Sequence, residues 1–485
     1  MDSSPQLQFQ AGFFQKFWLP TCIYAILYAI LLFDNFSGIT LPIWVLLTLL
    51  YVYVCFTLCN RPVKAAFWIY GSGMLLLSLS VMCTGNHALQ FFGNAGILCL
   101  LVGLLLHHFR RTDSWPLAKC FSAGVYTVFG PLGCISDFFS DAKASQQTYP
   151  GTKKTIATSL LIGVAIAFPI LLVVSTLLYF SDAVFASILN VHVLNYLKPD
   201  KLLGFVCLLA FALLSPYCTI RFLCKPVIPD GYRDYRRLEP LIAITVLVPV
   251  TLVYAFFCGI QFFSLFLGKM QLPDGYTYAQ YAREGFFQLL FVCIINLVIV
   301  LFIRGFFREN LILKILLTLL CACTYIMLAS SAMRMIMYIR AYQLTILRIL
   351  VLWTLLVIAC LLAGILIAIY YRPFSLGRYA LAVITVLFVG LSFSHPDNLI
   401  AAYNLQNYAE TAQSTTDTEY LSELSTDAAP AIAQYYDRIK ADTPYVPAWI
   451  AVYSQNIEDE YAADFRRFNV SHFVAERRIA TLLQQ

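Results

Sequence analysis

Charged residues are scarce in this chain, since Asp, Glu, Lys and Arg together make up only 12% of its 485 residues. Hydrophobic residues make up 60%, and the mean hydropathy is +0.76. Soluble domains are about 45–50% apolar, so this shortage of charge excludes an ordinary soluble protein. A bilayer explains the apolar excess, because helix surfaces that face lipid need no polar cover.

The signatures of several common enzyme classes are also missing. The chain has no glycine-rich phosphate loop ending in Gly-Lys-Ser or Gly-Lys-Thr, no His-Glu-x-x-His and no Gly-x-Ser-x-Gly. Its six histidines are scattered, and its basic residues form no block suited to nucleic acid. The sequence therefore predicts no cofactor, no metal and no nucleic-acid partner, and it favours a non-enzymatic role.

Cysteine is absent from the last part of the chain. All 15 cysteines lie between Cys22 and Cys360, nearly all in apolar stretches, where a thiol behaves as a small hydrophobic group. Their close pairs lack a second pair of ligands, so a zinc site is not expected. The cysteine-free segment 395–485 suits an oxidising, extracytoplasmic compartment.

Eleven apolar stretches fill the chain before this segment, and each approaches the roughly 20 residues that a helix needs to cross a bilayer. We therefore predict an all-α integral membrane protein, with a transmembrane domain at 1–394 and a small helical C-terminal domain at 395–485. The predicted spans are 18–33, 41–59, 66–83, 88–109, 156–180, 202–224, 240–267, 285–304, 311–331, 347–370 and 378–394.

Net charge is divided unevenly between these parts. Residues 395–485 contain 13 Asp and Glu but only 6 Lys and Arg, so the transmembrane part carries the basic excess. Its basic residues gather in the loops that follow even-numbered spans, near 60–65, 110–155, 225–239 and 304–310. Because Lys and Arg favour cytoplasmic loops, we expect a cytoplasmic N-terminus and an extracytoplasmic C-terminal domain.

The long loop 112–155 contains apolar residues at helical spacing. From Phe121 to Phe139 they recur every three or four residues, but Gly130, Pro131 and Gly133 interrupt them. This pattern indicates two short amphipathic helices on the cytoplasmic interface, with a re-entrant segment as the alternative.

Three polar clusters fall on the predicted outer face. The first opens the eighth span and contains Tyr281, Arg283, Glu284 and Gln288. Tyrosines at a span entrance are typical of an aromatic belt. A carboxylate at this depth, as at Glu284, is more informative because it requires a cation or a proton.

The second cluster contains Arg334, Tyr338, Arg340, Thr345 and Arg348, in the predicted connection between the ninth and tenth spans. On a continuous helix all of these except Arg340 share one face. The arginines either extend toward lipid phosphates or form an anion site. We predict that Glu284, Arg334 and Arg348 line one outward-facing cavity.

The third cluster is His395-Pro396-Asp397, followed by Tyr403 and Asn404. Asp397 is most simply the N-cap of a following helix. A His and an Asp two residues apart also suit general acid–base chemistry. We carry both residues as candidate site residues.

The C-terminal segment has helical periodicity throughout. Ser425-Thr426-Asp427 offers cap residues, and Pro430 lies where a first-turn proline is favoured. A last helix is predicted over Ile457–Leu483. The expected small core consists of Ile432, Tyr435, Ile439, Phe465 and Phe468.

Four ordered motifs resemble an uncharacterised bacterial family of polytopic membrane proteins, one of those classed as domains of unknown function. They are Tyr281-Ala282-Arg283-Glu284-Gly285-Phe286-Phe287, Arg334-Met335 through Tyr342-Gln343-Leu344-Thr345 to Arg348, His395-Pro396-Asp397 through Tyr403-Asn404-Leu405, and Tyr420-Leu421 through Asp427 to Pro430. The resemblance covers roughly 150–435 and implies a bacterial inner-membrane location. The chain departs from this resemblance at two positions. Gln343 stands where glycine is expected, and glutamine favours a continuous helix there. His395 stands where asparagine is expected.

Two classes of function compete. The arginines and Glu284 favour a protein that handles an anionic lipid or solute at the outer face, as a transporter or flippase does. The acidic helical segment 395–485 favours an envelope assembly or sensory subunit that binds a protein partner through this segment. A membrane-embedded transferase is a third alternative.

Overall fold

In the computed structural model the described part of the chain is helical apart from turns and one isolated β-bridge between Leu238 and Phe307. The structure describes residues 5–110, 112, 115–148, 163, 174, 178, 181, 199–227, 236–262, 278–371, 373–407, 415–439, 447–460 and 465–483. For 5–6, 199–203, 278–284, 415–418 and 480–483 only the backbone is described.

Ten described helices are long and apolar enough to cross a membrane, which shows a multi-pass membrane protein. They confirm ten of the eleven predicted spans, and the remaining one, 156–180, lies outside the described residues. The first span begins earlier than predicted, because its helix starts at Pro5. The helices are α1 (Pro5–Leu32), α2 (Thr40–Leu58), α3 (Ala66–Cys83), α4 (His87–Phe109), α9 (Pro199–Cys224), α10 (Pro240–Phe262), α11 (Tyr278–Phe306), α12 (Leu311–Tyr342), α13 (Ile346–Tyr370) and α14 (Leu376–Phe393).

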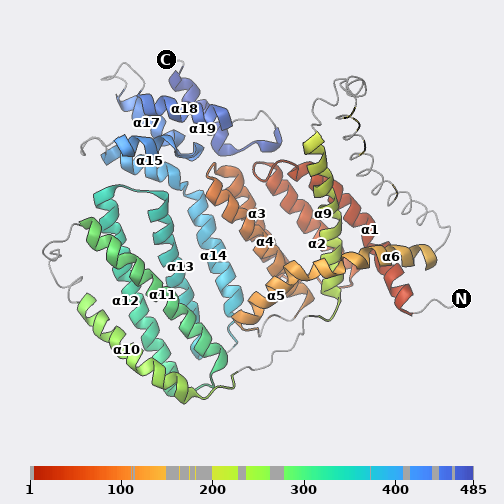
Figure 1. Cartoon of the computed structure of the whole chain (residues 1–485), viewed down its shortest axis with the longest axis horizontal. Coiled ribbons are helices and arrows are strands. Elements are labelled where there is room, and N and C mark those ends of the chain that lie inside the picture. The colour runs from red at the N-terminus through yellow and green to blue at the C-terminus, as the bar shows by residue number, and fades with distance from the viewer. Residues whose placement is uncertain are drawn as a thin grey trace.

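The spans form two groups, each with its own buried core. One core is built mainly from α1–α4 and α9, and the other mainly from α10–α13. The last span, α14, packs against both α3 and α13 and so joins the groups. Figure 1 shows the groups side by side with α14 between them and the C-terminal helices across their upper end.

The loop after α4 contains two helices, as predicted: α5 (Leu117–Phe129) and α6 (Ile135–Thr148), joined by the 3-10 turn η1 (Gly130–Cys134). Their apolar stripe faces outward, with Phe121 75% and Leu132 64% exposed. The break has a packing reason, because a Cβ at Gly130 would overlap the ring of Phe222 on α9. Exposed apolar residues beside a bundle fit helices that lie in the membrane interface.

The opposite side of α6 buries a charge. Asp141 is fully buried and lies 3.1 Å from Nε of Arg221 on α9. The hydroxyl of Tyr217 donates to the same carboxylate at 3.0 Å, and the guanidinium lies 5.0 Å from the centre of the Phe13 ring. The ion pair therefore joins α6 to α9, and the guanidinium also packs on α1 through Phe13.

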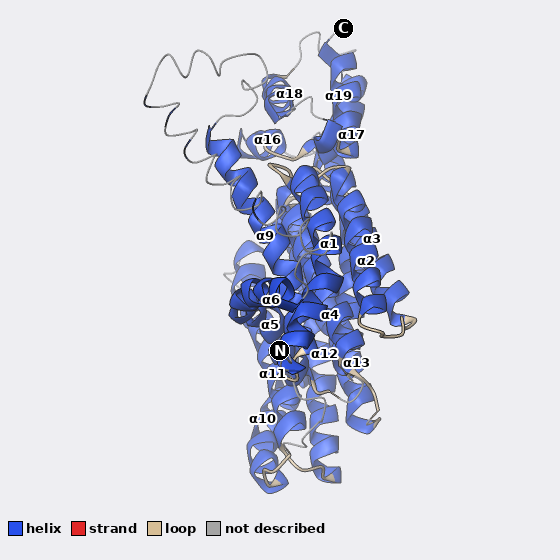
Figure 2. Ribbon diagram, turned by 90° about the vertical axis from the view of Figure 1, so that its right-hand side faces the viewer, coloured by secondary structure: helices blue, strands red, loops and turns tan. Residues whose placement is uncertain are grey.

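The C-terminal helices form a third core around Ile432 and Tyr453. Figure 2 shows them gathered at one end of the long membrane helices. They are α15 (Pro396–Asn407), α16 (Thr415–Ser422), the turn η4 (Thr426–Ala428), α17 (Ala429–Ile439), α18 (Ala448–Glu460), the turn η5 (Phe465–Arg467) and α19 (Val470–Leu483).

The predicted last helix over Ile457–Leu483 is wrong, because η5 interrupts it. The backbone of this turn contacts the α1–α2 connection instead of continuing a helix. The carbonyl of Arg466 accepts from Nδ2 of Asn35 at 2.7 Å, and the carbonyl of Phe468 accepts from the amide of Ile39 at 2.9 Å. Gly38, at φ +78°, permits this approach because a Cβ there would strike the η5 backbone.

Candidate functional site

Four helix connections meet the C-terminal helices at one end of the molecule, and we call this region the junction. It contains the connections α1–α2, α3–α4, α12–α13 and α14–α15, all bonded to residues between α15 and α19. All four of these connections follow odd-numbered spans in the predicted order, so they lie on one side of a membrane together with the C-terminal helices. The junction therefore includes two of the three predicted polar clusters.

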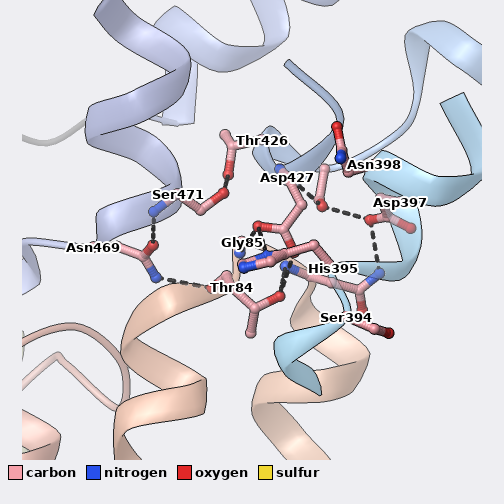
Figure 3. Close-up of polar contacts among 12 residues, drawn as sticks. Thr84, Gly85, Ser394, His395, Asp397, Asn398, Thr426, Asp427, Asn469 and Ser471 are labelled. Carbon is pink, nitrogen blue, oxygen red and sulfur yellow. Dashed lines mark hydrogen bonds and ion pairs between the residues drawn. The ribbon is translucent and has the colours of Figure 1, made fainter. Parts of the chain in front are cut away.

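A buried carboxylate lies at the centre of the junction. Asp427 of η4 accepts a hydrogen bond from the hydroxyl of Thr84 at 2.5 Å and another from the amide of Gly85 at 3.0 Å. Nδ1 of His395 lies 3.6 Å from the same carboxyl group. Figure 3 shows these groups converging from α3–α4, α14–α15 and the C-terminal helices.

His395 and Asp427 shift each other's pKa in opposite directions. Burial alone would raise the pKa of Asp427, but hydrogen bonds, first among them that of His395, lower this pKa below its usual value. The hydrogen bond to Asp427 raises the pKa of His395, and partial burial opposes this rise. Both partners are therefore held in their charged forms at mildly acidic pH.

Asp397 has a different role from the predicted one. It lies in the first turn of α15, so the N-cap interpretation is wrong. Its carboxylate is buried and accepts from Nδ2 of Asn86 at 2.9 Å and from the hydroxyl of Ser425 at 2.5 Å. The carboxylate that lies beside His395 belongs to Asp427 and not to Asp397.

A cavity of about 210 Å³ adjoins the His395–Asp427 pair. Its wall combines these two residues with Asn398 and with the hydroxyls of Thr426 and Ser471, which lie 2.8 Å apart. The remaining wall is apolar. The cavity thus places a histidine and hydroxyl groups at the boundary between membrane helices and C-terminal helices.

The second cluster does not form a continuous helix, and that prediction is wrong. The helix α12 ends at Tyr342, and Gln343 adopts φ +69°. Side chains of the C-terminal helices then bind the exposed backbone. The amide of Asn404 pairs with both backbone groups of Leu344, at 2.8 and 2.9 Å, and the hydroxyl of Tyr420 accepts from the amide of Ile346 at 3.0 Å.

Arg334 lies inside α12 rather than in the predicted connection, and it is 7% exposed. Its Nη2 lies 3.4 Å from Oε1 of Gln261 on α10, which also accepts from Ser330. Its guanidinium packs on α11 at Gly285, where any Cβ would overlap it. Arg334 therefore joins three spans of the second group.

Arg348 occupies the first turn of α13 and is partly exposed. Its Nη1 donates to the carbonyls of Tyr342, at 2.5 Å, and Gln343, and its guanidinium lies 4.4 Å from the centre of the Tyr338 ring. It borders a cavity of about 190 Å³ between α11, α12 and α13. The cavity wall is Phe286, Phe287, Met335, Tyr338, Thr345, Leu347, Arg348 and Val351.

The predicted common cavity is only partly assembled by the described side chains. Arg348 lines the cavity just described, whereas Arg334 is directed at α10 and α11 and is not part of that wall. The side chains of Arg283 and Glu284 lie outside the described residues, although the α11 backbone places them just before Gly285. Within the described chain no group of three His, Cys, Asp or Glu residues could hold a metal ion.

Sequence reasoning missed the partners at the junction. Thr84, Gly85 and Asn86 have no unusual local pattern beyond a turn. The cap expected before Pro430 is confirmed, since the Ser425 side chain accepts from the amide of Asp427 and Pro430 lies in the first turn of α17. The sequence therefore indicates the cap that contains Asp427, but no sequence pattern indicates the distant partners of this residue.

These features define an all-α, multi-pass membrane protein whose C-terminal helices are bonded to its helix connections. The profile of DUF4153, a domain of unknown function, matches residues 71–435. The chain therefore belongs to the DUF4153 family, which agrees with the resemblance found from its motifs. No curated protein and no solved structure matches the chain.

Proposed function

We propose that this protein handles an anionic lipid or a similar amphiphilic anion at the outer face of a bacterial inner membrane, as a transporter or flippase does. The cavity beside Arg348 is the observation that supports this proposal. Its apolar wall suits an acyl chain, and its single cation suits a phosphate or carboxylate.

The position of Arg348 adds further support. Two carbonyls bind its Nη1, so the guanidinium is held in a fixed orientation. An arginine has five N–H donors, and the described contacts use only those of Nη1, which leaves Nε and Nη2 for a ligand. The neighbouring Leu347 and Phe287 are 62% and 45% exposed, which gives an acyl chain a route from the bilayer to the cavity.

The proposed side of the membrane follows from charge. The connections at the opposite end contain Arg61, Lys64, Arg110 and Lys225, and this basic end suits the cytoplasm. The junction then faces outward, and the C-terminal helices cover the outer end of the bundle.

The test compares Arg348→Gln with Arg340→Gln, because Arg340 is an exposed arginine of α12 outside the cavity wall. Full-length protein in nanodiscs is titrated with phosphatidylglycerol, and bound lipid is measured by native mass spectrometry. Removing a charge-assisted contact of about 1.5–3 kcal/mol should weaken binding by at least tenfold in Arg348→Gln and leave Arg340→Gln unchanged.

Arg348 also binds the α12–α13 connection, so Arg348→Lys serves as a second variant that keeps the charge. If it retains lipid while Arg348→Gln loses it, charge recognition is supported. Equal lipid binding by wild type and Arg348→Gln would contradict the proposal.

A further inference from the structure

A second basic site lies at the other end of the α10–α13 group, away from the junction. Here α11 ends at Phe306 and α12 begins at Leu311, at the lower end of these helices in Figure 1. A cavity of about 40 Å³ at this end is lined by Arg236, Arg304, Arg308 and Lys314. The carboxylate of Glu309 also lies in its wall, and that of Glu239 lies 3.1 Å from Arg308.

Backbone hydrogen bonds and the carboxylates of Glu309 and Glu239 hold the basic side chains in place. The segment before α10 is bonded to the α11–α12 connection, since the amide of Leu238 donates to Phe306 and its carbonyl accepts from Arg308. One oxygen of Glu309 pairs with Arg236, and the other lies 3.0 Å from Nζ of Lys314. These contacts fix the positions of the basic side chains around the cavity.

Arg304 approaches the cavity from α11 and is anchored on a third helix. Its Nε donates to the carbonyl of Ala368, near the end of α13, at 3.0 Å. The N-terminus of the 32-residue helix α12 opens on the same cavity, with Asn310 as its N-cap. A helix N-terminus adds positive potential to that of the basic side chains.

The size and surroundings of the cavity fit one ligand class. A volume of about 40 Å³ is room for about three waters, which is comparable to one phosphate group. Four of the residues that line the cavity are basic and one is acidic, and this lining favours an anion. Beside the cavity, Leu311 and Ile315 are 71% and 55% exposed on α12, where acyl chains would lie.

We infer that this cavity binds the phosphate of an anionic phospholipid headgroup at the end of the bundle opposite to the junction. Basic pockets between membrane helices are suited to such headgroups. The inference uses none of the residues around Arg348 and does not depend on the proposed function.

The test uses Lys314→Gln and Arg304→Gln, with Lys143→Gln as a control that removes the same charge from an exposed position on α6. Full-length protein is purified, stripped of lipid and titrated with phosphatidylglycerol or phosphatidylcholine in nanodiscs. We expect each cavity variant to bind phosphatidylglycerol about tenfold more weakly, and the control to match wild type. Phosphatidylcholine binding should not distinguish the four proteins.

Inorganic phosphate forms the second arm. Phosphate binding that is lost in Lys314→Gln while phosphatidylglycerol binding stays unchanged would assign the site to free phosphate and overturn the lipid assignment. If Arg304→Gln fails to fold, Lys314→Gln and the charge-preserving Lys314→Arg decide, and Lys314→Arg should bind like wild type. Unchanged binding in Lys314→Gln would overturn the inference.

Discussion

The His395–Asp427 pair makes the attachment of the C-terminal helices dependent on pH. The folded-state pKa of His395 is raised, so its contribution to stability is complete below the usual value of 6.5 and is lost as pH rises through the raised value. The folded-state pKa of Asp427 is lowered, so its contribution is present above 3.8 and is lost as pH falls through the lowered value. Both contributions are therefore complete between pH 3.8 and pH 6.5, where the pair stabilises the junction most.

His395 contributes less to the stability of the junction than Asp427 does. The His395 side chain is 37% exposed, so solvent screening limits its contribution to about 1 kcal/mol or less. Asp427 is fully buried and has several donors. Leaving such donors unpaired in Asp427→Ala should cost about 3 kcal/mol or more. Other titratable groups near the pair include Cys83, which lines the same cavity, Asp397 on α15 and the exposed His87 at the start of α4.

Hydrogen exchange of the Gly85 amide measures this attachment, because that amide donates to Asp427. In full-length protein, and after correction for intrinsic exchange rates, protection should fall up to about fivefold between pH 6 and 9. The variant His395→Asn tolerates the φ of +46° at this position and removes the titration. It should abolish the pH dependence, and His87→Asn, a nearby exposed histidine, should retain it. The reasoning is refuted if His395→Asn and wild type lose protection in parallel.

Two further predictions concern the membrane helices. Gln343→Gly should raise the midpoint of thermal unfolding, because relief of a backbone with φ +69° and ψ 174° is worth about 1–3 kcal/mol; an unchanged or lower midpoint would contradict the strain. Arg221→Leu should destabilise the protein by about 3–5 kcal/mol, because it leaves Asp141 buried and charged. The double variant Arg221→Leu/Asp141→Leu should recover much of this loss, and a double variant no more stable than the single one would count against an ion pair as the cause.

Hydropathy predicts the membrane helices well, because burial in lipid depends on composition over about 20 residues rather than on particular partners. The same principle misplaced Arg334. An arginine ends an apolar window, so the ninth span was predicted to stop at 331, whereas α12 continues to Tyr342. Contacts with Gln261 and the glycine at 285 accommodate the charge within the helix, and no local pattern reveals them.

The sequence predicts several residues of the candidate site but not the residues that they contact. His395 and Asp397 both lie in the junction, but each is bonded to residues at least 28 positions away in the chain. The expected core of the C-terminal segment was correct for the buried Ile432 and wrong for Phe465, which is 76% exposed. Helical periodicity indicates which residues share a face, but the neighbouring helix decides whether that face is buried.

We propose above that an anionic amphiphile occupies the cavity beside Arg348. Its most direct test is an electron cryo-microscopy structure of the full-length protein in nanodiscs that contain phosphatidylglycerol. We expect headgroup density within hydrogen-bond distance of the Arg348 guanidinium and acyl density along Phe287 and Leu347. An empty cavity, with ordered lipid resolved elsewhere around the helices, would contradict it.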